Sequence, residues 1–584
     1  MARSWSLPAP LRQTELGEAL RACRSAFLGV GAMSLVINIL YLTGSFFMLE
    51  IYDRVLPSRS IPTLVGLMIL AAVLYMSQGL LDLIRSRILV RVGSALDEML
   101  SARVYDVVIR VPLITGSRGE GIEPVRDLDN IRSFLSGMGP GALFDLPWLP
   151  FYIAICFAFH PLLGLTALVG AVILISLTVV TEYLTQAPAR RASSLAVRRQ
   201  DLVSASRRNA EVLVAMGMAG RVGKLWNESN RAYIESNQQT SDVSGGLGAI
   251  AKVLRMTLQS AVLGVGAYLA INQQATAGII IAGSILSARA LAPVDLAIAH
   301  WKGFVVARQS WKRLNTLLAK LPPVSTPTLL HDPSRRMSVE SLTITPPGQQ
   351  KAVVQDVTFA LEAGHGVGII GPSGSGKSSL VRALVGVWQP LRGKVRLDGA
   401  ALDQWSSETL GVHIGYLPQD VELFAGTIAQ NISRFEDDAG SDHIIAAAKE
   451  AGVHDLIIGM GDGYDTQIDD RGSVLSAGQA QRIALARALY RQPFLVVLDE
   501  PNSNLDSEGD EALTRAVLSV RARGGVVVVV AHRPVGIAGV DFVLVLKDGR
   551  AQAFGPKDAV LDQVLKRTPS QAPVKIVADG GTKS

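Results

Sequence analysis

The sequence is poor in cysteine and in charge, and each shortage excludes a class of protein. Two cysteines, Cys23 and Cys156, cannot build a disulfide framework and give no metal-ligand spacing. Only 18 % of the 584 residues are charged and 49 % are hydrophobic, which excludes a disordered chain. The mean hydropathy of +0.31 is high for a soluble protein and indicates membrane segments. The 56 basic residues exceed the 50 acidic ones too little to indicate nucleic acid as a partner.

What the sequence has instead is long stretches without charge, and four of these lie before residue 289, at 26–49, 61–81, 146–181 and 256–288. The first two are each long enough for one helix across a hydrocarbon core, which needs roughly 20 residues. The last two would each run roughly 50 Å as a single helix, so both indicate hairpins. His160-Pro161 and the amide cluster around Gln273 mark the two turns.

The sequence therefore predicts six membrane spans, near residues 26–49, 61–82, 142–159, 161–182, 254–271 and 275–294. Buried helices of a large soluble domain are the alternative, which charge-free runs longer than about 18 residues disfavour. Arginines cluster before the first span, after the second and after the fourth, and the turns at 160 and 272–274 carry none. Because cations flank the cytoplasmic ends of spans, we expect both termini to be cytoplasmic.

The loops at 82–145 and 182–255 contain few helix breakers, so we expect the spans to continue into the cytoplasm as helices and to turn back. We expect these extensions to contact the soluble half near residues 112–119 and 214–222. The N-terminal 25 residues lack the features of a removable signal peptide, so the first span is expected to be retained.

The composition changes after a proline-rich segment at 321–327. Beyond it, helical segments alternate with short β-branched runs, at 353–360, 367–370, 395–397, 494–498 and 525–530. This alternation favours an α/β domain with a largely parallel sheet. The predicted division is an N-terminal segment, a six-helix transmembrane domain, a linker, an α/β nucleotide-binding domain and a flexible tail, at 1–25, 26–320, 321–336, 337–565 and 566–584.

A glycine-rich loop follows the run at 367–370 and matches the phosphate-binding pattern Gly-x4-Gly-Lys-Ser. Its residues are Gly371, Pro372, Ser373, Gly374, Ser375, Gly376, Lys377, Ser378 and Ser379. The glycines allow backbone N–H groups to turn toward phosphate oxygens at a helix N-terminus. Lys377 supplies a positive charge to the β- and γ-phosphates, and the Ser378 hydroxyl is placed to ligate Mg²⁺.

A second motif supports this interpretation, because the apolar run at 494–498 leads into Asp499 and Glu500. A central strand that ends in aspartate holds that carboxylate near Mg²⁺ in phosphate-loop proteins. Glu500 can then orient or deprotonate an attacking water. A loop start or a helix cap is the structural alternative for such a pair, but the intact phosphate loop favours the functional reading. The sequence predicts ATP and Mg²⁺ as ligands.

Four further motifs resemble those of the ATP-binding-cassette (ABC) proteins, in matching order and spacing throughout 337–565. They are a signature sequence at Leu475, Ser476, Ala477, Gly478 and Gln479, a Q-loop at Gln419, a D-loop at Ser503, Asn504, Leu505 and Asp506, and a switch histidine at His532. The resemblance implies a head-to-tail pair of cassettes, in which Ser476 and Gly478 of one chain close over the ATP of the other. It also implies catalytic roles for Lys377, Glu500 and His532, and Gln419 as a further Mg²⁺ ligand.

Two positions depart from the family pattern. Ala477 stands where the family usually has a second glycine, and if that site needs positive φ, alanine costs about 1 kcal/mol and alters the kinetics. Residues 338–352 contain no aromatic side chain, where the family often stacks adenine. We therefore expect loose base selectivity.

Six spans followed by one cassette resemble a half-transporter of the exporter type, which works as a homodimer, and residues 466–472 resemble an exporter loop. Residues 144–150, 289–294 and 415–424 resemble the type I secretion ATPases, in the branch that exports metalloproteases, lipases and haem-binding proteins. The resemblance implies an ATP hydrolase of the bacterial inner membrane, joined to a periplasmic membrane fusion (adaptor) protein and an outer-membrane channel protein. It implies unfolded protein substrates with an uncleaved C-terminal signal.

A lipid, drug or peptide exporter shares this architecture and is the alternative. Arg289 and Asp295 lie at the inner-leaflet end of the last predicted span. Charge there is costly unless it faces water or a partner. The hypothesis is that both residues line the substrate path, and snorkelling toward the membrane surface is the alternative.

Overall fold

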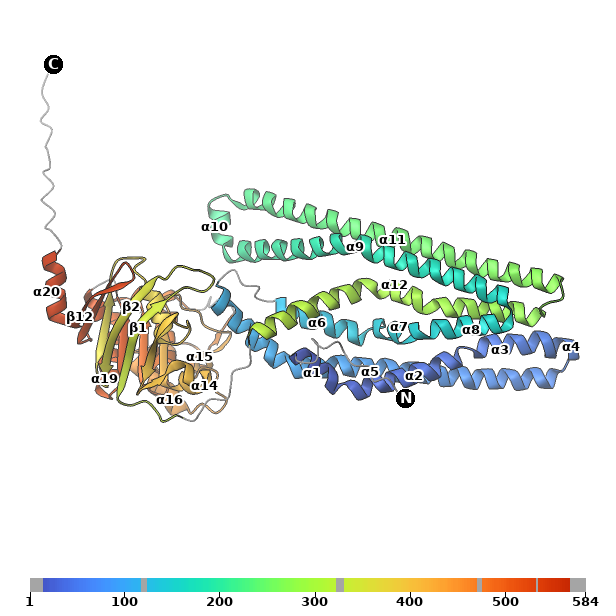
Figure 1. The fold of residues 1–584 in the computed structure, drawn as a ribbon. Coiled ribbons are helices and arrows are strands. Elements are labelled where there is room, and N and C mark those ends of the chain that lie inside the picture. Colours follow the sequence, from blue (N-terminus) through green and yellow to red (C-terminus); the bar gives the residue numbers. More distant parts are fainter. Residues whose placement is uncertain (1–13, 117–122, 322–329, 470–474, 532–533, 568–584) are drawn as a thin grey trace, which may run out of the picture. The chain divides into compact units, whose positions relative to one another are not determined.

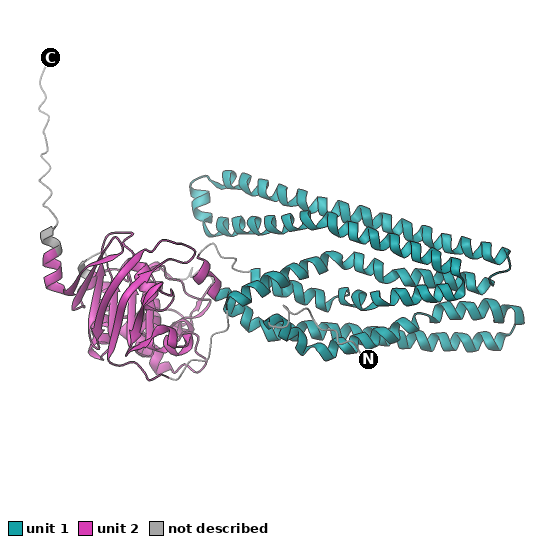
Figure 2. Ribbon diagram, in the orientation of Figure 1, with its two compact units in different colours: residues 1–109, 120–322 teal, residues 110–119, 323–584 magenta. Residues whose placement is uncertain are grey.

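The computed structural model describes residues 14–116, 123–321, 330–469, 475–531 and 534–567. The chain divides into two compact units (Figure 2), the first made of Met1–Ile109 and Glu120–Pro322 and the second of Arg110–Gly119 and Pro323–Ser584. The predicted fold class is confirmed: apolar helices form the first unit, and an α/β domain forms the second.

Six helices of the first unit are long and apolar enough to cross a membrane. They are Arg24–Ser58, Ile61–Thr115, Gly139–Phe159, Pro161–Arg208, Ala219–Ile271 and Ala277–Lys320. Four of them are single helices, namely α5 (Ile61–Thr115), α9 (Pro161–Arg208), α11 (Ala219–Ile271) and α12 (Ala277–Lys320). The first joins α2 (Arg24–Leu40), α3 (Thr43–Glu50), a π-helical turn (Ile51–Val55) and α4 (Leu56–Ser58). The third joins α7 (Gly139–Asp145), a 3-10 turn (Leu146–Trp148) and α8 (Leu149–Phe159).

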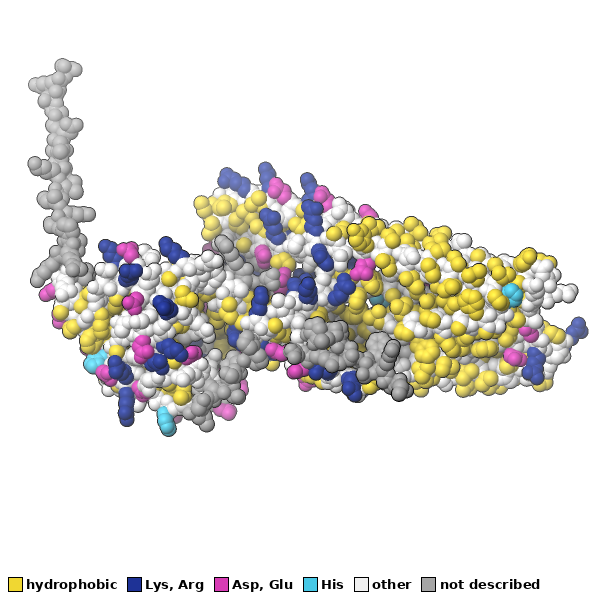
Figure 3. Space-filling view, in the orientation of Figure 1, with side chains coloured by type: hydrophobic (Ala, Val, Ile, Leu, Met, Phe, Trp, Pro, Cys, Tyr) yellow, Lys and Arg dark blue, Asp and Glu magenta, His cyan; other side chains and the backbone are white. Residues whose placement is uncertain are grey.

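The described residues of this unit also form three shorter helices, α1 (Glu15–Ala22), α6 (Glu123–Ser136) and α10 (Ala210–Ala215). The expected helical extensions are present, because α5, α9 and α11 run far past the lengths that a bilayer needs. Figure 1 shows α9 and α11 side by side as a long antiparallel pair, joined at one end by α10. Figure 3 shows hydrophobic side chains over the part of this unit that holds α3 and α8, and basic side chains gathered at the other ends of α9 and α11.

Both predicted hairpin turns are present. His160 is the extended N-cap of α9, where its ring nitrogen accepts a hydrogen bond from the Leu162 N–H at 3.2 Å. Gln273 has a left-handed backbone, with φ 58°, in the turn before α12. The third span begins at Gly139, earlier than the predicted 142, because Pro140 fits the first turn of a helix.

A buried ionic cluster lies among α2, α5, α7 and α8. The Arg85 guanidinium donates to both carboxylate oxygens of Asp145, at 2.9 and 3.0 Å, and to the Ser34 hydroxyl at 3.0 Å. Asn38 also donates to Asp145, and the Tyr152 hydroxyl donates to Asn38. These bonds tie together helices that offer each other little hydrophobic driving force in lipid.

The second unit is built on a six-stranded sheet with the order β12-β11-β3-β10-β9-β6. Its strands are β3 (Gly366–Ile370), β6 (Ile414–Leu417), β9 (Leu495–Asp499), β10 (Val526–Val530), β11 (Phe542–Lys547) and β12 (Arg550–Pro556). Every pair is parallel except β11 with β12. Alternate valines of β10 enter two different hydrophobic cores, one on each face of the sheet. Burial of both faces explains the continuous β-branched runs in the sequence.

A second, antiparallel sheet was not expected from the sequence. It has the order β2-β1-β4-β5 and contains β1 (Arg336–Ile344), β2 (Val354–Glu362), β4 (Arg392–Leu397) and β5 (Ala400–Ala401). The predicted runs at 353–360 and 395–397 are strands of this antiparallel sheet and not of the parallel one. Strand β1 alternates buried and exposed residues and is interrupted by register shifts, which hides it from a search for continuous apolar runs.

Helices cover the two faces of the parallel sheet. They are α13 (Lys377–Leu384), α14 (Ser407–His413), α15 (Ile428–Ile432), α16 (Ser441–Glu450), α17 (His454–Ile458), α18 (Ala477–Leu489) and α19 (Ser507–Ala522). Helix α20 (Lys557–Arg567) follows the last strand. A short strand pair, β7 (Gly426–Thr427) and β8 (Gln467–Ile468), lies between α14 and α18 in the sequence. Helix α13 shares a core with the antiparallel sheet, and α18 and α19 pack into the other core.

Two predicted boundaries can be compared with these elements. Helix α20 continues to Arg567, so residues 566 and 567 are helical, and the rest of the predicted tail lies outside the described residues. Half of the predicted linker, residues 322–329, also lies outside them. Residues 110–119 group with the second unit. Gly116 lies against Pro347 of the same unit: a Cβ on Gly116 would lie 3.0 Å from the Pro347 carbonyl oxygen. This agrees with the contact predicted near 112–119. The contact predicted near 214–222 stays a prediction.

Candidate functional site

The glycine-rich loop lies between β3 and α13, at the carboxyl edge of the parallel sheet. Gly376 is the N-cap of α13 and has φ 97°, a left-handed conformation that favours glycine. A Cβ on Gly371 would lie 2.1 Å from the Leu546 carbonyl oxygen, so only glycine fits where this loop passes β11. Residues 372–375 form the turn between them, ahead of the first turn of α13, which holds Ser378 and Ser379.

Lys377 occupies the first position of α13 and is 5 % exposed. Its Nζ donates to the carbonyl oxygens of Gly371 and Pro372, at 2.9 and 3.1 Å. Burial lowers the pKa of the ammonium group, and the nearby charges of Glu500 and Asp499 act in the opposite direction. The loop therefore holds a cation beside the free N–H groups at a helix N-terminus, an arrangement suited to phosphate.

Asp499 ends β9, and β10 separates this strand from β3. Because the three strands are parallel, their carboxyl ends bring Asp499 and the phosphate loop to one edge. Burial raises the pKa of Asp499, whereas a hydrogen bond from the Ser378 side chain lowers it. Its Oδ1 atom is buried and has no hydrogen-bond partner in the described part of the chain. An unpaired carboxylate oxygen next to a hydroxyl fits a Mg²⁺ site, because Mg²⁺ prefers oxygen ligands.

Glu500 follows directly and has a left-handed backbone, with φ 53°. A non-glycine residue in this region is under strain of about 1–2 kcal/mol. Its N–H donates to the Val530 carbonyl oxygen at 3.1 Å, which extends the pairing of β9 with β10 by one bond. Gln419, just past β6, donates through Nε2 to Oε2 of Glu500 at 3.3 Å. The structure thus brings the predicted Q-loop glutamine and the predicted base together.

The signature residues open helix α18. Ser476 is the N-cap, and its side chain and that of Gln479 form a reciprocal capping box. Ala477 is the first helical residue and is absent from the described non-glycine residues with positive φ. The condition for a backbone penalty at Ala477 is therefore not met. A Cβ on Gly478 would lie 2.8 Å from the Asn504 carbonyl oxygen, so this glycine allows a close approach to the predicted D-loop.

The D-loop residues connect Glu500 to helix α19, whose N-cap is Asp506. The Asp506 side chain accepts from the Gly509 N–H at 2.9 Å and from Arg482 of α18 at 2.5 Å. The Gly509 bond is the main cause that lowers the pKa of Asp506. His532 and residues 470–472 of the predicted exporter loop lie outside the described residues, so their predicted roles stay predictions.

Sequence reasoning missed Gln481, a buried amide of α18 that bonds to residues 501–504. Its position two residues beyond the signature gave no signal, because the bonding pattern depends on how α18 packs against a distant turn.

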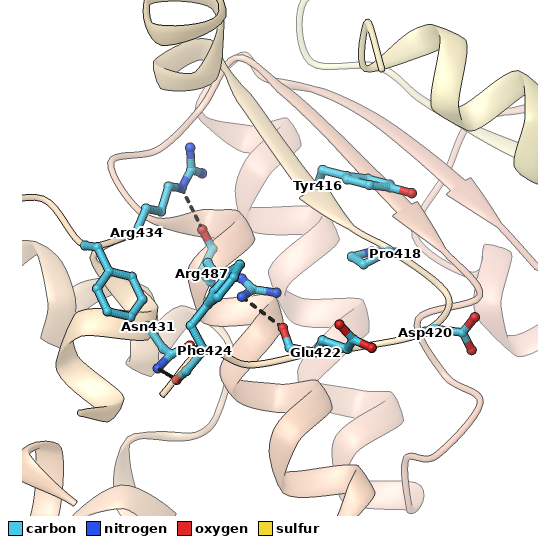
Figure 4. A pocket seen from close by; sticks show the side chains of 9 residues that line it. Tyr416, Pro418, Asp420, Glu422, Phe424, Asn431, Arg434 and Arg487 are labelled. Carbon is cyan, nitrogen blue, oxygen red and sulfur yellow. Dashed lines mark hydrogen bonds between the residues drawn. The ribbon is translucent and has the colours of Figure 1, made fainter. Parts of the chain in front are cut away.

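A hollow of about 470 Å³ lies beside the segment that follows Gln419 (Figure 4). Arg487 of α18 donates to the Glu422 carbonyl oxygen at 3.2 Å. Arg434 donates to the carbonyl oxygens of Arg487 and Gly411, at 3.0 and 2.5 Å, and burial lowers its pKa to about 10. These arginines attach the signature helix to the segment around Gln419.

The two residues predicted for the substrate path have different surroundings. A groove of about 770 Å³ in the first unit lies among α6, α9, α11 and α12, and Asp295 is one of its lining residues. Asp295 accepts from Arg255 of α11 at 2.7 Å, and Arg255 lines the same groove. The Arg289 guanidinium lies over the Tyr41 ring, 4.8 Å from its centroid, and is not among the lining residues.

Comparisons with known proteins match a family model to each of the two units. The model of the ABC transporter transmembrane region matches residues 27–294, and the ABC transporter model matches residues 354–503. A solved structure described as a bacterial Atm1-family ABC exporter with ATP bound has a TM-score of 0.81 at 22 % identity and covers 94 % of this chain and 99 % of its own. At this identity the likeness supports the fold.

Curated relatives extend along almost the whole chain. The type I secretion system ATP-binding protein PrsD of Rhizobium meliloti is 59 % identical over 97 % of this chain and 98 % of its own. The cyclolysin secretion/processing ATP-binding protein CyaB of Bordetella pertussis is 28 % identical over 96 % of this chain and 77 % of its own. The leukotoxin translocation ATP-binding protein LktB of Mannheimia haemolytica is 26 % identical, over 96 % and 78 %. The chain is thus a multi-pass inner-membrane protein with an ATP-hydrolysing domain, and it belongs to the type I secretion ATP-binding proteins of the ABC transporter family.

Proposed function

We propose that this chain is the ATPase and permease of a type I secretion system and exports unfolded proteins that carry a C-terminal signal across the inner membrane. The observation that carries the proposal is the near full-length likeness to the ATP-binding protein PrsD, at 59 % identity, in a chain that holds both the six helices and the nucleotide site. Both termini are cytoplasmic in this proposal, because the arginine clusters lie on the side of the long helical extensions.

ATP binds with its phosphates on the loop at 371–379, where Lys377 neutralises charge on the β- and γ-phosphates. Ser378, Asp499 and Gln419 would hold Mg²⁺, which supplies further neutralisation of the charge that develops on the phosphates. Glu500 orients the attacking water and accepts its proton, with Gln419 holding one of its oxygens. His532 is assigned to the γ-phosphate side, by its position after β10.

Two copies of the chain act together in this proposal. Ser476 and Gly478 lie at the N-terminus of α18, where free N–H groups offer donors to a second phosphate surface. ATP held between the loop of one chain and the signature of the other favours the closed pair, and hydrolysis removes that preference. The D-loop, at 503–506, contacts both the signature and the catalytic base, because Asn504 lies close to Gly478 and the Ser503 N–H bonds to the Glu500 carbonyl oxygen.

The groove around Asp295 offers polar partners to a polypeptide cargo. Most of its lining residues have hydroxyl, amide or charged side chains, such as Thr240, Asn237 and Ser244. An unfolded chain carries backbone N–H and C=O groups that need partners, and such side chains supply them. The periplasmic adaptor protein and the outer-membrane channel protein complete the export path.

The test is the ATPase rate of the purified protein in liposomes. A C-terminal peptide from a candidate secreted protein of the same bacterium is added, with a scrambled peptide of the same composition as the control. The proposal expects the native peptide to change the rate and the scrambled one to leave it unchanged. Stimulation by lipids or hydrophobic drugs with no response to any candidate peptide would contradict the proposal and favour the alternative exporter class.

A further inference from the structure

Gln481 lies on α18, five residues beyond its N-cap, and is 2 % exposed. Its Nε2 donates to the Pro501 carbonyl oxygen at 2.6 Å and to the Ser503 hydroxyl at 3.4 Å. Its Oε1 accepts from the Asn504 N–H at 3.1 Å. One buried side chain therefore bonds on both its donor and acceptor sides to the turn that follows Glu500.

The turn after Glu500 begins with a strained residue and is closed by a long backbone bond. Glu500 is strained in the left-handed region, and the Ser503 N–H bonds back to the Glu500 carbonyl at 3.3 Å, a long distance. The Gln481 Nε2 atom is also 3.5 Å from that same carbonyl oxygen. A strained residue persists only where its surroundings determine its conformation. The Gln481 side chain, on helix α18, helps to hold the turn after Glu500 in this conformation.

We propose that Gln481 is a positioning residue: it holds the 500–504 turn so that the Glu500 carboxylate points at the attacking water, and it ties that direction to the signature helix of the same chain. Two further contacts make α18 and the turn one block, the close approach of Gly478 to Asn504 and the Arg482 bond to Asp506. A shift of α18 when its signature meets the partner chain's ATP then reaches Glu500. The inference rests on the proposed role of Glu500.

Two substitutions of Gln481 test its donor and acceptor atoms. Gln481→Glu keeps an acceptor for the Asn504 N–H but loses the donor and places a carboxylate against the Pro501 carbonyl. Gln481→Met keeps the length of the side chain and removes all three hydrogen bonds. We expect each substitution to lower kcat for ATP hydrolysis about tenfold or more. A misplaced Glu500 carboxylate raises the activation free energy, and about 1.4 kcal/mol on that barrier is a factor of ten in rate. KM should stay within about twofold, because the loop at 371–379 is not touched.

A stability control is needed because a buried amide is being replaced. Val520→Ala removes volume from the hydrophobic core into which α18 also packs, near the C-terminal end of α19, where Val520 is 1 % exposed. It should lower the melting temperature and leave kcat unchanged. If Val520→Ala lowers kcat as much as Gln481→Met at equal loss of melting temperature, the effect is general destabilisation and the inference fails.

The deciding experiment is a double-mutant cycle with Glu500→Gln. If Gln481 acts through the Glu500 carboxylate, Gln481→Met will not lower the residual ATPase rate of Glu500→Gln any further. If the two losses multiply, Gln481 acts elsewhere and the inference is overturned. The proposed function fails separately: an active Glu500→Gln protein refutes the assigned base itself, whatever Gln481 does.

Discussion

The ion pair between Arg85 and Asp145 offers a quantitative test of what holds the transmembrane helices together. The two side chains are 12 % and 7 % exposed, and the Asp145 carboxylate accepts two bonds from Arg85 and one from Asn38. Asp145→Ala leaves a buried guanidinium with Asp82 and Ser34 as its remaining partners. Removing one partner of a buried pair costs about 3–5 kcal/mol, because the other charge stays desolvated.

The assay is unfolding in mixed micelles, followed by tryptophan fluorescence, for Asp145→Ala, Arg85→Met and the double variant. We expect Asp145→Ala to lose about 3–5 kcal/mol of unfolding free energy and the double variant to recover most of the loss. The double variant leaves neither member of the buried pair, and the Asp82 carboxylate that also loses Arg85 is 33 % exposed. Asn38 keeps a bond to the Ser34 carbonyl oxygen, so it is not left unpaired. A loss below about 0.5 kcal/mol for Asp145→Ala, the size typical of surface changes, or no recovery in the double variant, would refute the reasoning.

Three further predictions concern the nucleotide site. Gly371→Ala should abolish ATP binding measured by equilibrium dialysis, because its Cβ would lie 2.1 Å from the Leu546 carbonyl oxygen; retained affinity would contradict the assigned loop geometry. Asp499→Asn should raise the melting temperature of the nucleotide-free protein at pH 7, since burial raises the pKa of Asp499 and the folded state is penalised as pH rises above the ordinary carboxyl value. That gain should vanish near pH 3, where Asp499 is protonated in both states, and stabilisation by Mg²⁺-ATP should be lost; a gain that does not depend on pH would contradict the cause. The KM values for ATP and GTP should differ less than about tenfold, or 1.4 kcal/mol, since residues 338–352 offer no aromatic side chain to the base; a larger difference would mean that other residues select adenine.

The sequence predicts the parts of this molecule that repeat a simple physical pattern. Charge-free runs predict the six spans because a backbone in lipid must satisfy its own hydrogen bonds, and an apolar run of about 20 residues does so as a helix. Strands β3, β9 and β10 are predicted because burial on both faces demands continuous apolar residues. The phosphate loop and Asp499 are predicted because their residue types and spacing are fixed by the chemistry they perform.

Other features depend on packing between distant segments, which no local pattern records. Strand β1 alternates and carries bulges, so its sheet is not visible as a run. Gln481 looks like any helical glutamine until α18 lies against the 500–504 turn. Arg289 and Asp295 are close in sequence, yet one stacks on Tyr41 and the other lines the groove, because helix rotation points them to different neighbours.

The measurement that tests the account most directly is the assembly state of Glu500→Gln loaded with Mg²⁺-ATP. The variant binds nucleotide but lacks the base, so the pair of chains should stay closed. Single-molecule photobleaching in liposomes, and sedimentation in detergent, should both count two copies per particle with Mg²⁺-ATP. Particles that hold one copy in both settings, with and without nucleotide, would contradict the claim that ATP joins two chains to drive export.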